Sequence, residues 1–211
     1  MTIQKRFYRP NANNREDTVK MKKLLILALT LIMTFCFCSC SNQGDEIIVG
    51  DGLKLAGLDA GNKAVEYSFT YPENWSMIRN DGVIEIQFDC NESAMYAEYA
   101  TLSVLTFGLD DASKTAKAYW TDHEKQLQGI YTDYKLLDTE EYAEKDKYLD
   151  DVPALKVKYS GKINDITYVN EQIVACRYGK VFLITLVVPE NGMEKVEGVM
   201  DVIKKDFKFA D

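Results

Sequence analysis

The sequence predicts an α+β fold for residues 64–211, an antiparallel β-sheet with helices packed on it. Several short segments alternate apolar and polar residues between turn residues, which is the pattern of half-buried strands. Two other segments repeat apolar residues at three- and four-residue spacing, which predicts helices with one buried face. Because the order along the chain is strands, helix, strands, helix, we expect one domain with two helices on the sheet.

The first strands are each bounded by a turn signal. Tyr67, Phe69 and Tyr71 alternate with smaller residues, and Pro72 ends that strand. The sequence Asn80-Asp81-Gly82 predicts a turn before a strand from Val83 to Asp89. Another strand is expected from Ala100 to Phe107, where Gly108 ends it.

A helix of about five turns is expected next, and residues 110–113 supply candidate N-caps. Its apolar stripe consists of Ala116, Tyr119, Trp120, His123, Leu127 and Ile130. The final helix places Met193, Val196, Met200 and Ile203 on one face, with Phe207 one turn further on.

The second set of strands lies between these helices. Leu155, Val157 and Tyr159 alternate up to Gly161, and residues 166–188 form a predicted hairpin whose strands meet at 178–180. Its second strand, 181–188, is nearly all apolar, so we expect both of its faces to be buried.

Four stretches of the chain resemble the PsbP/Mog1-like family: YSFTYPENW (Tyr67–Trp75), VPALKVKYSG (Val152–Gly161), QIVACRYGKVFLITLVVPE (Gln172–Glu190) and DFKF (Asp206–Phe209). In that family an F-x-x-x-Y-P-x-x-W opening leads into the sheet, and the chain ends with a helix and a short aromatic stretch. The resemblance covers residues 65–211. It implies an α/β/α sandwich and a non-enzymatic accessory or binding role, and the family includes many bacterial lipoproteins.

Residues 21–39 are identified as a lipoprotein signal peptide. Lys22 and Lys23 precede an apolar run of 14 residues, and the small Ser39 stands immediately before Cys40. As a helix the run would be about 21 Å long, which is short of the roughly 30 Å hydrocarbon core of a bilayer. We therefore expect a diacylglyceryl anchor on Cys40, with an ordinary secretory signal as the alternative.

The remaining N-terminal segments are expected to lie outside the folded domain. Residues 1–20 read as a mis-called start or an extended n-region of the signal. Residues 40–63 are rich in Gly, Asp and Asn, with one short apolar run at 47–49, which predicts a flexible tether ending in at most an edge strand. A tether of about twenty residues would have a root-mean-square length of about 25 Å.

The charge excludes one class of partner. The whole chain carries 25 basic and 33 acidic residues, of which residues 1–40 hold seven and two. Residues 41–211 therefore carry 18 basic and 31 acidic residues, a net charge of −13. Because this charge repels phosphate backbones and anionic headgroups, we expect no nucleic-acid partner and membrane contact only through the lipid.

The usual ingredients of a catalytic or cofactor site are sparse. His123 is the one histidine, and its place on the apolar stripe predicts a packed structural residue. Cys90 and Cys176 follow the alternation of their strands and read as core residues, with a disulfide between them left open. We expect no catalytic residue, cofactor or metal ligand.

Two surface features remain as alternatives. Acidic residues crowd residues 138–151 without the spacing of a calcium loop, so a solvated face is favoured over a cation site. Met95, Tyr96 and Tyr99 could cover a ligand or partner surface, or cap the edge of the sheet.

The sequence thus predicts a membrane-anchored lipoprotein that faces outside the cytoplasm. We expect it not to be an enzyme but an accessory or protein-binding module with a partner in the cell envelope. The second hypothesis is a binder of small ligands or cations that uses residues 138–151. The third is an envelope hydrolase built on carboxylates, for which the expected site is absent from the sequence.

Overall fold

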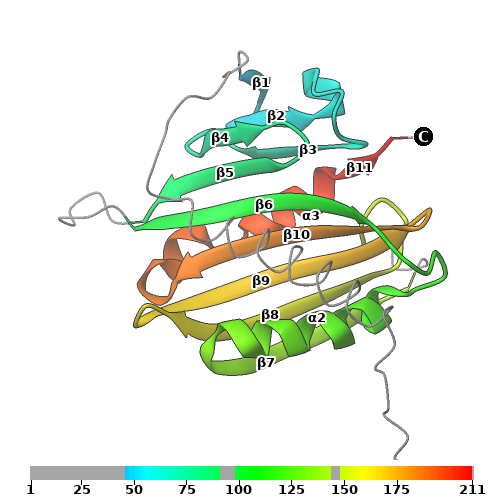
Figure 1. Cartoon of the computed structure of the whole chain (residues 1–211). Helices are drawn as coiled ribbons and strands as arrows, with labels where there is room; N and C mark the ends of the chain where they lie inside the picture. The colour runs from blue at the N-terminus through cyan, green and yellow to red at the C-terminus, as the bar shows by residue number, and fades with distance from the viewer. Residues whose placement is uncertain (1–45, 91–97, 144–147, 211) are drawn as a thin grey trace, which may run out of the picture. The chain divides into compact units, whose positions relative to one another are not determined.

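The computed structural model describes residues 46–90, 98–143 and 148–210, all within the compact unit Ser41–Asp211. These residues form two antiparallel sheets (Figure 1). The larger sheet has seven strands in the order β4 (Ser76–Asn80), β5 (Ile84–Asp89), β6 (Tyr99–Gly108), β10 (Lys180–Pro189), β9 (Ile166–Arg177), β8 (Ala154–Ile163) and β7 (Thr132–Tyr142). The smaller sheet has the order β1 (Ile47–Gly50), β2 (Leu53–Gly57), β3 (Tyr67–Pro72) and β11 (Lys208–Phe209).

Two α-helices and two 3-10 helices accompany the sheets in the described residues: α2 (Ala116–Ile130), α3 (Val199–Asp206), η2 (Leu58–Ala60) and η4 (Glu190–Val196). The predicted α+β class is confirmed. The single predicted sheet is a partial description, since the strand that begins at Tyr67 lies in the smaller sheet. None of the helices in these residues is long and apolar enough to cross a bilayer.

The main core lies between the large sheet and the layer formed by α3 and the small sheet. Alternate residues of strand β10 contribute to this core. Phe182, Ile184 and Leu186 belong to it, and the residues between them point to the other face of the sheet. The rings of Tyr67 and Phe69 stack on Phe207, which follows α3, with centroids 5.4 and 6.1 Å away. As predicted, β10 is almost entirely buried.

Helix α2 packs on the opposite face of the large sheet, over β7, β8 and β9 (Figure 1). The Trp120 ring lies 5.7 Å from the ring of Tyr159 on β8. Tyr131, which caps the end of the helix, donates its hydroxyl hydrogen bond to Asn170 Oδ1 on β9 at 3.3 Å. The helix is therefore fixed to the half of the sheet that ends at β7.

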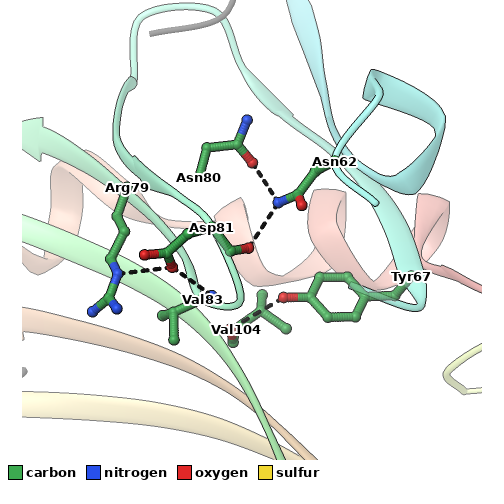
Figure 2. A network of polar contacts seen from close by, with 7 residues as sticks. All are labelled: Asn62, Tyr67, Arg79, Asn80, Asp81, Val83 and Val104. Carbon is green, nitrogen blue, oxygen red and sulfur yellow. Dashed lines mark hydrogen bonds and ion pairs between the residues drawn. The ribbon is translucent and has the colours of Figure 1, made fainter. Parts of the chain in front are cut away.

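Figure 2 shows how the predicted Asn80-Asp81-Gly82 turn ties the two sheets together. Asn62, which follows η2, donates from Nδ2 to Asn80 Oδ1 at 2.7 Å and to the Asp81 carbonyl at 2.9 Å. The Asp81 carboxylate accepts from Val83 N at 2.9 Å and from Arg79 Nε at 3.0 Å. The loop of the small sheet is thus bonded to the β4–β5 hairpin of the large one.

The tether expected over residues 40–63 is wrong for residues 53–60, while the edge strand that the apolar run at 47–49 allowed is present as β1. Residues 53–60 form β2 and η2, and β2 pairs with β3 over five residues. Its glycines serve the fold: Gly57 has a φ of +94°, and a Cβ there would lie 2.1 Å from the Tyr67 carbonyl oxygen. The folded domain therefore begins about seventeen residues before the predicted boundary at residue 64.

Both predicted helices need a correction at their ends. Helix α2 has 15 residues, about four turns, and its N-cap is Thr115, outside the candidates at 110–113. Thr115 Oγ1 accepts from Ala118 N at 3.2 Å. The predicted final helix is two pieces, η4 and α3, because Gly198 between them has a left-handed φ of +79°.

Candidate functional site

The feature of the described surface best suited to recognition is β7, the last strand of the seven-stranded sheet. Within the described part of the chain it pairs with β8, and no strand follows it in the sheet order. Its eleven residues are mostly exposed, including Leu136 at 45% and Leu137 at 49%. An open strand edge presents unpaired backbone donors and acceptors, so β7 can accept an added strand.

A β-bulge shapes this edge. Leu136 pairs with Tyr159 and Asp138 pairs with Lys158, which leaves Leu137 as an extra residue between them. A bulge of this kind bends the strand and increases its local twist. The two exposed leucines therefore stand at the bend of an otherwise polar strand.

Contacts with the neighbouring elements hold β7 in place. Lys117 Nζ on α2 pairs with Glu141 Oε2 at 2.8 Å, and Tyr134 donates to Glu124 Oε1 at 3.1 Å. Near the end of the strand, the ring of Tyr142 stacks on Tyr148 with centroids 3.7 Å apart. Burial and the neighbouring Glu124 carboxylate raise the pKa of Tyr134 well above its usual range, so its hydroxyl stays protonated and able to donate.

The acidic residues of the 138–151 region are divided between two places. Asp138, Glu140 and Glu141 lie on β7, whereas Asp150 and Asp151 lie in the turn before β8. The members Glu144 and Asp146 lie outside the described residues. Within those residues no group of three or more His, Cys, Asp or Glu side chains could hold a metal ion.

A hollow of about 450 Å³ lies beside the second of these places. Its lining consists of Tyr148, Asp150, Asp151, Lys204, Lys205, Phe207 and Lys208. Lys208 Nζ pairs with Asp150 Oδ1 at 3.0 Å, and the other Asp150 oxygen accepts from Phe209 N at 2.8 Å. Because lysines surround these carboxylates, the hollow disfavours a divalent cation.

His123 lies where the sequence placed it, on the sheet-facing side of α2. Its ring stacks on Tyr119 and meets Trp120 edge-on, with centroids 5.6 and 5.8 Å away. Burial lowers the pKa of His123 from 6.5 to about 4, so the ring is neutral at physiological pH. These contacts are those of a packed structural residue.

The two cysteines of the domain are free thiols, so the disulfide left open by the sequence is not formed. Cys90 belongs to the main core, whereas Cys176 pairs with Val181 on the opposite face of the sheet. Burial raises the pKa of both thiols, and that of Cys176 reaches about 11. The prediction of a buried residue is confirmed for Cys90, and Cys176 is half-buried.

The other predicted surface residues are only partly described. Cys40, Met95 and Tyr96 lie outside the described residues, and Tyr99 begins β6 with a partly exposed side chain. Sequence reasoning missed Leu136-Leu137, whereas the apolar run at 47–49 had allowed the edge strand that β1 forms. The signal that could have found the leucines is an adjacent pair of large apolar residues inside the polar segment 132–142.

Comparisons with known proteins support the fold. No protein-family model matches the chain, and no curated protein matches it. The solution structure of cyanobacterial PsbP (CyanoP) from Synechocystis sp. PCC 6803 is 16% identical, covers 82% of this chain and 98% of its own, and has a TM-score of 0.54. The chain therefore has the α+β fold of PsbP-like proteins.

Two further structures are more distant. A protein of unknown function from Pseudomonas aeruginosa, described as a putative regulator, is 11% identical over 64% of this chain and 85% of its own, with a TM-score of 0.47. LpqN from Mycobacterium tuberculosis, described as involved in cell envelope biogenesis, is 12% identical over 81% of this chain and 88% of its own, with a TM-score of 0.41.

Proposed function

We propose that this protein is a lipid-anchored envelope protein whose domain is a non-catalytic accessory module that binds a protein partner through the edge of β7. The observation that carries the proposal is the open eleven-residue strand edge with Leu136 and Leu137 exposed at its bulge. The partner contributes an extended segment that continues the seven-stranded sheet.

Strand addition uses the chemistry that β7 presents. Backbone hydrogen bonds supply much of the affinity, and pockets for alternate side chains supply specificity. Leu136 and Leu137 offer apolar area next to the added strand, since each is nearly half exposed. The Lys117–Glu141 ion pair and the Tyr134–Glu124 hydrogen bond link β7 to α2, and an edge that is restrained before binding loses less entropy on binding.

The negative charge of the domain determines which kind of partner segment can pair with β7. Lys135 precedes the two leucines and Asp138 and Glu140 follow them, so β7 is more acidic than basic on their C-terminal side, and residues 41–211 carry a net charge of −13. An added strand with basic side chains among apolar ones would be complementary to this edge, and an acidic strand would be repelled. The proposed partner is therefore an envelope protein with a basic, extended segment.

The non-catalytic role is supported by the state of the one histidine. His123 is packed between aromatic rings on α2, and its lowered pKa keeps it neutral. The lipid anchor on Cys40 is supported by the signal-like sequence of residues 21–39. It would hold the module at the membrane facing outside the cytoplasm.

The test places a photo-crosslinking amino acid at position 137 of the full-length protein in its native envelope. The matched control carries it at position 166, the first residue of β9, where Ile166 is 50% exposed against 49% for Leu137. We expect a discrete adduct with one protein from position 137, and none with that protein from position 166.

Purified components then decide the mode of binding. On binding the trapped partner, the backbone amides of β7 should become protected from hydrogen exchange, because they enter a new strand pair. Leu136→Asp with Leu137→Asp should weaken the affinity at least about tenfold, while Ile166→Asp should leave it unchanged. Equal affinities, or no protection of β7, would refute the proposal.

A further inference from the structure

Strand β1 exposes three consecutive aliphatic side chains at the start of the folded domain. Ile47, Ile48 and Val49 are 40%, 65% and 50% exposed. The strand is the outer member of the small sheet, where it pairs with β2 (Figure 1). Because successive side chains of a strand point to opposite faces, the three residues form an apolar tip rather than one buried face.

This tip is held in a fixed position. Glu46, immediately before it, pairs with Lys54 on β2 at 2.6 Å and accepts from Met77 N at 3.3 Å. Tyr71 on β3 also donates to Glu46 at 3.5 Å. The chain is therefore attached to both sheets at Glu46, and Ile47 is the first residue of the exposed strand.

The length of chain before the tip limits its distance from the proposed anchor. Six residues separate Cys40 from Ile47, so their Cα atoms lie at most about 25 Å apart even at full extension. Acyl chains on Cys40 would begin at the inner boundary of the headgroup layer, which is itself about 5–8 Å thick. An anchored domain thus keeps β1 within roughly 20 Å of the membrane surface.

We propose that β1 rests on the bilayer, with Ile47, Ile48 and Val49 among the lipid headgroups, and that this contact orients the domain. The inference rests on the lipid anchor of the proposed function. The anchor makes the contact intramolecular, so even a small apolar patch stays engaged at the high effective concentration that a short tether gives. The patch alone would give only weak, reversible membrane binding.

The orientation fits the position of the proposed docking edge. Figure 1 shows β1 and β7 at opposite ends of the array of strands. With β1 on the bilayer, β7 faces away from it and is accessible to an envelope partner. The acidic surface of residues 41–211 favours neutral or zwitterionic headgroups, because anionic lipids would repel it.

The test uses the full, acylated protein in vesicles of phosphatidylcholine. An environment-sensitive fluorescent amino acid is incorporated at position 48, which is 65% exposed, or, as the control, at position 166, which is 50% exposed. We expect a blue-shifted emission and strong quenching by brominated lipid from position 48, and neither from position 166. The probe at position 48 should lose quenching in vesicles enriched in phosphatidylserine at low salt.

A second variant separates lipid contact from any change of fold. With the probe at position 49, Ile47→Asp and Ile48→Asp together should remove at least half of the quenching, while Leu136→Asp should leave it unchanged. Protein that floats with vesicles but is not quenched at position 48 overturns this inference and leaves the anchor intact. Protein that does not float overturns the anchor and the inference together. A blue shift without bromine quenching indicates a protein on β1 instead of lipid, and also overturns it.

Discussion

The role of His123, a residue type that is often catalytic, is determined by the side chains packed around it. A lone histidine near two aromatic residues is compatible with either a catalytic or a packed role. The structure places its ring against Tyr119 and Trp120, and burial there lowers its pKa to about 4. The sequence could predict the packed role, because 3.6-residue periodicity put His123 on the buried face.

This pKa makes stability depend on pH in a defined direction. Between pH 6.5 and 4 the unfolded state binds a proton at His123 and the folded state does not, so stability falls as the pH falls through this window. We expect the His123 contribution to cost about 1–2 kcal/mol between pH 7 and pH 5. His123→Gln should lose this part of the pH dependence, measured by urea unfolding at both pH values. An equal pH dependence in the two proteins would show that the ring is exposed to protons.

Gly57 is a residue whose role only the structure reveals. Its φ of +94° is costly for any other residue, and a Cβ would lie 2.1 Å from the Tyr67 carbonyl oxygen. We expect Gly57→Ala to reduce the free energy of unfolding by about 2 kcal/mol or more. Gly108→Ala is the control, since a Cβ there has open space, and it should change stability by less than about 0.5 kcal/mol. Similar losses would refute the close approach of β2 and β3.

At the scale of elements, the sequence predicted those whose two faces differ. Strands β3, β5, β6 and β8 alternate between a core face and another face, so a period of two marks them, whereas β10 was marked by its nearly continuous apolar run. Strand β7 is largely exposed on both faces, so its sequence does not alternate between apolar and polar residues. The candidate docking edge was therefore not predicted from the sequence. Strand β1 was allowed only as an edge strand at the end of a tether, and β2 was missed, because their glycines and short length read as a tether.

The start of α2 was placed at the wrong residue for a related reason. Residues 110–113 hold several good N-cap types, but only the folded backbone shows that Thr115 is the cap. Thr115→Ala should reduce the free energy of unfolding by about 1 kcal/mol, because Ala118 N loses its acceptor. The matched control is Thr121→Ala in the same helix, which should be neutral or slightly stabilising, since alanine has the higher helix propensity. Chemical denaturation measures both, and a neutral Thr115→Ala would contradict the assigned cap.

At the scale of the whole molecule, the fold is shown by the structure, whereas the proposed function depends on particular edges of that fold. The α+β fold follows from residues 46–210 and is that of PsbP-like proteins. A fold of this kind does not specify an activity, because function depends on the site that it carries. The proposed role therefore depends on the two edge strands β7 and β1 and on the proposed anchor at Cys40. The anchor would act by limiting the distance between β1 and the membrane, because only six residues separate Cys40 from Ile47.

The anchor can be tested at this scale by its effect on location. Of the three cysteines near the end of the apolar run, Cys40 follows the small Ser39, whereas Cys38 follows the bulky Phe37. Cys40→Ala should move the protein from the membrane fraction to the soluble fraction, because two acyl chains anchor stably and their loss leaves only weak contacts. Cys38→Ala should remain in the membrane fraction.

The same pair of variants separates the anchor from β1. If β1 contacts lipid only because Cys40 holds it there, released Cys40→Ala protein should not rebind vesicles at physiological salt, since three partly exposed aliphatic side chains give marginal affinity. Strong rebinding would mean that the domain itself is the membrane anchor. Retention of Cys40→Ala in the membrane fraction of cells, with no rebinding to vesicles, would instead point to a membrane-bound protein partner as the main attachment.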